Sequence, residues 1–162
     1  MPRPDSQDPL LPSLIDRLID RDPDVSTEPA WRQSQNLREY EQSVLRDLEA
    51  LLNTRQTVAD LPADFGETSQ SILTYGLPEF LSITAGSPHE RERLAQAVQQ
   101  VIAQFEPRLR QVNVHVKEPT GPHDRTIRMA IDALLWVEPN PLPITFDTLL
   151  QPSSGQCKVQ AR

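Results

Sequence analysis

The sequence has little cysteine, glycine and lysine. Its 162 residues include one Cys, five Gly and, among sixteen basic residues, only two Lys, Lys117 and Lys158. The lone Cys157 cannot form an internal disulfide, which is typical of a protein kept in a reducing compartment. No stretch approaches the roughly 18 consecutive apolar residues that a membrane helix needs. Residues 1–9 lack the apolar core of a secretory signal. We therefore expect a cytoplasmic protein without membrane insertion.

The charge balance is acidic. The formal net charge is -7, and the apolar content is 37%. Nucleic-acid binding requires a clustered basic face, so we expect no nucleic-acid partner. The preference for Arg over Lys suits bidentate contacts with other proteins. A GC-rich genome would give the same preference.

Residue patterns for catalysis are absent. The three histidines, His89, His115 and His123, do not have the spacing of metal ligands. There is no Gly-rich phosphate loop and no Gly-x-Ser-x-Gly motif. Glu106 is the carboxylate in the most unusual position, but Arg108 would keep it ionised, which is wrong for a general acid. We predict no catalytic residues, no cofactor site and no metal site.

The first segment, residues 1–35, is polar and rich in proline. It contains one short amphipathic pattern, capped by Ser13 and Asp16. Four residues share the apolar face of this helix: Leu14, Ile15, Leu18 and Ile19. A helix this short is not stable alone. It is either the N-terminal edge of the core or a docking helix that enters a groove on a partner.

Residues 36–162 have the pattern of one domain. Helices are predicted from Asn36 to Leu52, from about Ser69 to Tyr75 and from Ser87 to Phe105. The first has capping-box spacing, the second should end at a left-handed Gly76, and the third begins with Ser and Pro and ends before Pro107.

After the third helix the period changes from 3.6 to 2. Strands are predicted at residues 112–117, 126–137, 143–147 and 157–159. The fold class is therefore α+β, with N-terminal helices packed on a small C-terminal antiparallel sheet.

The junction between the last helix and the first strand carries the most informative motif. Glu106 and Arg108 flank Pro107, and in an extended chain their side chains would project to the same side. Because Pro107 fixes the backbone, the pair could act as a stiff clamp that binds an Arg and a carboxylate of another chain. The other interpretation is a proline that ends the helix, with flanking charges satisfied within the domain.

This segment resembles the Glu-Pro-Arg signature of the TssE family of contractile injection machines. Three further blocks resemble that family in the same order: Pro12–Leu18, Ser43–Arg55 and Ser71–Pro78. The C-terminal blocks Ile131–Leu135 and Pro143–Thr148 also fit. The resemblance covers most of residues 12–159. Residues 20–35 depart from it, so no contact is carried over there.

The resemblance implies a structural subunit of a type VI secretion baseplate, in the bacterial cytoplasm near the inner membrane. Such a subunit links the wedge proteins TssF and TssG to the sheath proteins TssB and TssC, and it templates sheath polymerisation by strand addition. The partner-binding residues implied are Glu106, Pro107 and Arg108, with Leu14, Ile15, Leu18 and Ile19 added from the docking-helix interpretation. The alternatives are a peptidoglycan-cleaving, lysozyme-like enzyme, after an older label of the family, and a regulatory anti-adaptor of the same fold family that shields a sigma factor.

Overall fold

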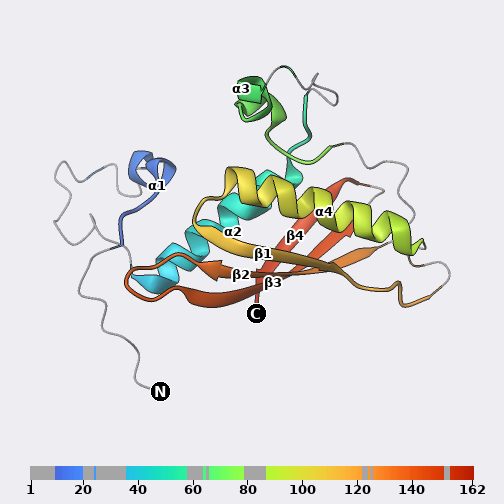
Figure 1. The fold of residues 1–162 in the computed structure, drawn as a ribbon. Coiled ribbons are helices and arrows are strands. Elements are labelled where there is room, and N and C mark those ends of the chain that lie inside the picture. The colour runs from blue at the N-terminus through green and yellow to red at the C-terminus, as the bar shows by residue number, and fades with distance from the viewer. Residues whose placement is uncertain are drawn as a thin grey trace.

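Two long helices cover one face of an antiparallel sheet (Figure 1). The helices are α2 (Leu37–Asn53) and α4 (Pro88–Phe105). The strands, in the spatial order β1-β2-β3-β4, are β1 (Leu109–Val116), β2 (Ile127–Leu135), β3 (Leu142–Gln151) and β4 (Gln156–Ala161). The α+β prediction is confirmed. This computed structural model describes residues 10–19, 24, 36–57, 64, 66–78, 87–121, 124, 126–151 and 154–162.

The long helices begin and end close to where the sequence places them. At the start of α2, Asn36 and Glu39 form the predicted capping box, in which each side chain accepts from the other residue's backbone N–H at 3.0 Å. Ser87 occupies the N-cap of α4, but its hydroxyl makes no capping hydrogen bond. Pro88 instead starts that helix with a φ that is already helical. None of the helices in the described part of the chain is long and apolar enough to cross a membrane.

The short helices differ more from expectation. The N-terminal pattern forms α1 (Leu14–Leu18). The single helix predicted at residues 69–75 is wrong, because the structure has α3 (Gly66–Ser69) followed by a 3-10 turn, η2 (Ile72–Thr74). Hydroxyl groups of Ser71 and Thr74 donate to nearby carbonyls and compete with regular helical hydrogen bonds.

Gly76 is left-handed as predicted, with φ of +103°. A Cβ atom at this position would lie 2.5 Å from the carbonyl oxygen of Thr54, so close packing adds to the requirement for glycine.

The core lies between the helices and the sheet. Strand β2 alternates regularly, and its odd-numbered residues from Ile127 to Leu135 face α2 and α4. Strand β1 cannot do this without an irregularity, because its buried residues change from odd (Leu109) to even (Val112, Val114). A β-bulge between Arg110 and Asn113, with a left-handed Gln111 at φ of 51°, inserts the extra residue that keeps both sets on the buried face.

The outer edges of β4 and β1 differ in the contacts that they make. The backbone N–H and C=O of Cys157 point away from β3, and the side chain of Asn53 at the end of α2 binds both, at 2.8 Å each. Arg55 donates to the carbonyl of Gly155 in the preceding turn, at 2.9 Å. These contacts cover the start of β4, whereas no element in the described residues pairs with the outer edge of β1.

We predict that Asn53→Ala destabilises the domain by about 1–3 kcal/mol, because the backbone N–H and C=O of the buried Cys157 lose their partner. Asn113→Ala on the exposed face of β1 is the matched control. Urea denaturation of both variants measures the free energy of unfolding. Equal midpoints would mean that water replaces the Asn53 side chain at no cost.

Candidate partner-binding site

Glu106 is buried at the point where α4 ends and β1 begins. The residue is only 4% exposed, and its backbone N–H donates to Ile102 at 2.9 Å as the last hydrogen bond of α4. Its carboxylate accepts from the side chain of Arg108 through both oxygens, with Nε at 2.6 Å from Oε1. The backbone N–H of Arg108 also donates to Oε1, at 3.2 Å. The two side chains therefore project to the same side, as the sequence indicates, and bind each other.

Arg108 also binds helix α2. Its Nη1 donates to the hydroxyl of Ser43 at 2.9 Å, and its Nη2 donates to Asp47 at 2.7 Å. Its guanidinium lies 6.0 Å from the centre of the Tyr40 ring. Burial acts to lower the pKa of Arg108, but the hydrogen bonds and charges of Glu106 and Asp47 outweigh it and raise the pKa overall. The guanidinium thus stays charged and joins three elements.

Helix α1 is attached to the same region of α2. The guanidinium of Arg46 binds Asp16 on α1 and, through Nε at 3.0 Å, also binds Asp47. The Asp16 side chain is 5% exposed. The hydrogen bond from Arg46 lowers the pKa of Asp16 well below its usual range, and Ser13 and Ser43 act in the same direction. A lowered carboxyl pKa stabilises the fold above the ordinary pKa of Asp, and this contribution is lost as pH falls through the folded-state value.

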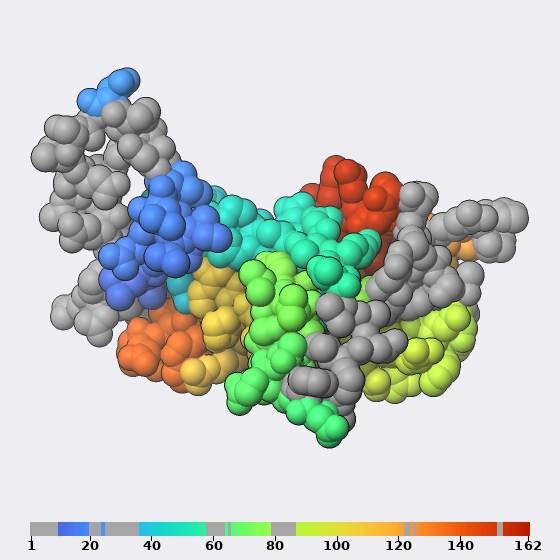
Figure 2. Space-filling view, turned by 90° about the horizontal axis from the view of Figure 1, so that it is seen from above, coloured from blue at the N-terminus to red at the C-terminus, as the bar shows by residue number. Residues whose placement is uncertain are grey.

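The apolar side chains of α1 point away from the domain. No residue of this helix is buried. Figure 2 shows α1 at one end of the molecule, beside α2. The four predicted docking residues are all exposed: Leu14 at 73%, Ile15 at 57%, Leu18 at 74% and Ile19 at 45%. Leu11, at 71%, extends the same surface. These side chains are not the edge of the core, and contact with a partner remains a prediction.

The residues that join the two predicted groups were not identified from the sequence. Ser43, Arg46 and Asp47 share one face of α2, because they are three and four residues apart. Asp16 was assigned only a capping role, which it also fills: Ser13 donates to its carboxylate at 2.7 Å. A polar run of this spacing beside the buried Val44 and Leu48 indicates that this face of α2 makes polar contacts, but it does not identify the residues contacted.

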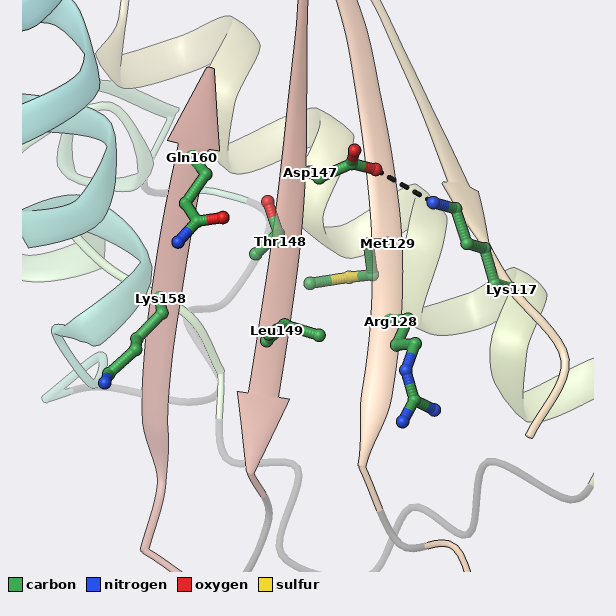
Figure 3. A pocket seen from close by; sticks show the side chains of 8 residues that line it. All are labelled: Lys117, Arg128, Met129, Asp147, Thr148, Leu149, Lys158 and Gln160. Carbon is green, nitrogen blue, oxygen red and sulfur yellow. Dashed lines mark hydrogen bonds and ion pairs between the residues drawn. The ribbon is translucent and has the colours of Figure 1, made fainter. Parts of the chain in front are cut away.

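The open face of the sheet carries a shallow hollow, whose lining side chains are drawn in Figure 3. Lys117 and Asp147 form an ion pair of 2.8 Å across it. Arg128 on β2 and Lys158 on β4 add positive charge to its lining. Asp147 is the only carboxylate among the lining residues. The hollow does not have the acid and nucleophile that glycoside hydrolysis needs.

The histidines and the single cysteine are the remaining candidates for chemistry. Across the described residues there is no cluster of three or more potential metal ligands. His89 begins α4, His115 is exposed on β1, and His123 lies outside the described residues. Cys157 is buried in β4, and burial raises the pKa of its thiol to about 12, so it is not a nucleophile at neutral pH.

We predict that Glu106→Gln and Arg108→Gln each lower the free energy of unfolding by about 1–3 kcal/mol, because each leaves a partly or fully buried group without its partner. The matched control is Glu118→Gln, whose side chain is 85% exposed and which should change stability by less than about 0.5 kcal/mol. Guanidinium denaturation followed by circular dichroism measures all three. If all three variants have the same midpoint, the ion pair does not stabilise the domain.

Comparison with known proteins gives a family match. The family described as "Baseplate wedge protein gp25" matches residues 38–140, which include α2, α4, β1 and β2. The match contains the Glu106–Arg108 segment, and α1 lies outside it. The family resemblance stated from the sequence is confirmed.

A solved structure shares the fold. It is titled "The baseplate complex from the type VI secretion system", and one of its chains aligns with a TM-score of 0.50 and 21% identity. The alignment covers 70% of this chain and 96% of that chain.

Curated relatives cover less of the chain. The anti-adapter protein IraD of Salmonella paratyphi A is 30% identical over 77 residues, and that of Salmonella typhimurium is 29% identical over the same length. The match covers 48% of this chain and 59% of each relative, so the chain spans less than two thirds of their length.

Proposed function

Since the chain belongs to the family of the baseplate wedge protein gp25, we propose that it is a structural subunit of a type VI secretion baseplate. It acts by binding other proteins rather than by catalysis, in the cytoplasm near the inner membrane. The family match over residues 38–140 is the observation that carries this conclusion. The likeness of fold to a chain of a type VI baseplate complex supports it.

The wedge partners are TssF and TssG, and the docking surface consists of α1 together with the Glu106–Arg108 segment. Exposed leucines on a helix fit an apolar groove in a partner. Four side chains with exposed fractions from 45% to 74% would bury apolar area in such a groove. Pro107 is exposed beside the buried Glu106 and extends the surface toward β1.

The sheath partners are TssB and TssC, which add a strand to the sheet. The β1 edge suits this role. Asn113, His115 and Lys117 face β2 in the hydrogen-bonded pairs, so the backbone groups of Val114 and Val116 point outward. On the opposite edge, Asn53 already occupies the outward groups of Cys157. Within the described part of the chain no strand pairs with these outward groups, so an extended segment of another chain can bind along β1.

A regulatory binding module is the second candidate, favoured by the 30% identity to an anti-adapter protein over 77 residues. The two functions differ in their partners. Affinity for TssF–TssG supports the baseplate function, and binding to a sigma-factor adaptor without binding to TssF–TssG would support the second.

We predict that Leu14→Ser combined with Leu18→Ser weakens binding to purified TssF–TssG by roughly 30-fold or more. The reason is that the apolar area of two leucine side chains is no longer buried in the complex. Isothermal titration calorimetry measures the dissociation constant. The melting temperature should not change, since both side chains are more than 70% exposed. Ile72→Ser removes an 84% exposed apolar side chain from η2 and is the matched control. If the double variant and the Ile72→Ser control bind TssF–TssG with equal affinity, α1 does not contact the wedge.

We predict that the purified protein does not cleave peptidoglycan. Glu106 is buried, and both of its carboxylate oxygens already accept hydrogen bonds from Arg108, so the carboxylate is not open to a substrate. Loss of turbidity in a cell-wall suspension is the measurement, with heat-treated protein as the control. Lysis that Glu106→Gln abolishes would contradict a purely structural function.

A further inference from the structure

A continuous chain of opposite charges connects the Glu106–Arg108 pair to α1. Glu106 binds Arg108, Arg108 binds Asp47 at 2.7 Å, Asp47 binds Arg46, and Arg46 binds Asp16. The ends of this chain are 90 residues apart in sequence and belong to the two groups that the sequence predicts to bind partners. Each link is a charge-assisted hydrogen bond, which is stronger than a neutral one.

A second and shorter connection runs through Ser43. This serine is 3% exposed, and its hydroxyl accepts from Arg108 at 2.9 Å. After Arg46 and Ser13, Ser43 also contributes to lowering the pKa of the Asp16 carboxyl. One residue, Ser43, lies between Arg108 and Asp16 on this route, whereas two residues, Asp47 and Arg46, lie between them on the other.

The geometry leads us to infer that Ser43, Arg46 and Asp47 are positioning residues, through which the Glu106–Arg108 pair holds α1 with its apolar face outward. The Glu-Pro-Arg segment then controls partner binding by fixing α1, without its two charges touching the partner. This inference rests on the proposed function in so far as α1 is the docking helix. The coupling itself is a property of the free chain.

The burial of Glu106 and Arg108 distinguishes a role in positioning α1 from direct contact with a partner. Both oxygens of Glu106 accept from Arg108, and the Glu106 and Arg108 side chains are 5% and 19% exposed. A partner that bound these charges directly would first have to break the internal hydrogen bonds. Helix α1, by contrast, has five residues, none of them buried. A helix of that length is not stable in water alone, so its position depends on contacts with the domain, which in the described residues include the Asp16 anchor and the packing of Leu10 against the core.

The first experiment measures α1 in the free protein. Heteronuclear NOE values of the amides of residues 14–18 report whether the helix is ordered. In the unchanged protein they should match those of α2. They should fall in Asp16→Asn, in Asp47→Asn and in Arg108→Gln, while α2 keeps its values. Lys117→Gln removes an ion pair on the open face of the sheet and is the control, with no change expected.

Asp47 and Asp16 variants keep the test decisive if Arg108→Gln does not fold, because the Asp47 side chain is 22% exposed and the Asp16 anchor lies outside the core. Unchanged NOE values in both Asp16→Asn and Asp47→Asn would overturn the inference. That result would leave the proposed function standing.

The second experiment combines Arg108→Gln with Leu18→Ser and measures affinity for TssF–TssG. If Arg108 acts through α1, the two substitutions remove the same contact. The fold-loss of affinity in the double variant should then be smaller, by more than about threefold, than the product of the fold-losses in the two single variants. If the fold-loss in the double variant equals that product while α1 stays ordered, Arg108 contacts the partner directly and the inference is overturned. Single variants that all bind normally would count against α1 docking and so against the proposed function.

Discussion

Arg108 makes the interaction on which the arrangement of the helices depends. It lies between α4 and β1, and its guanidinium reaches across to Ser43 and Asp47 on α2. Its carbonyl accepts from Trp136 at 2.7 Å, next to the end of β2. One side chain and one carbonyl therefore join two helices and two strands at one end of the domain. A lysine could not replace it, because the fork of a guanidinium binds Glu106 through two nitrogens while a third reaches Ser43.

The sheet is covered by helices on one face only, and this sets what the molecule can do. The covered face supplies the core, from Ile127 and Met129 on β2 to Phe146 on β3. The other face is open, with the Lys117–Asp147 ion pair beside the exposed Leu149. Surfaces at the ends and edges remain for binding: α1 at one end and the outer edge of β1. A protein built this way is suited to joining other chains, as expected for a member of a baseplate wedge family.

Glu106 is a buried charge at the junction of α4 and β1. The sequence left two interpretations open, a clamp for another chain and charges satisfied within the domain. In the structure the charges are satisfied internally, by each other and by α2. Through Asp47 and Arg46 the buried pair is also connected to Asp16 on the exposed helix α1, which is the basis of the positioning role inferred above.

The sequence by itself determined the elements whose causes are local. The capping box at Asn36, the proline start of α4, the left-handed Gly76 and the alternation of β2 follow from neighbouring residues, and they form as predicted. The sequence also placed Glu106 and Arg108 on the same side. Tertiary structure decided the rest. The bulge at Gln111 is required by packing against the helices, and the 3-10 turn at residues 72–74 results from hydroxyl groups that bind local carbonyls. The links from Asp16 to Arg46 and from Asp47 to Arg108 span 30 and 61 residues, so no local pattern records which charges meet.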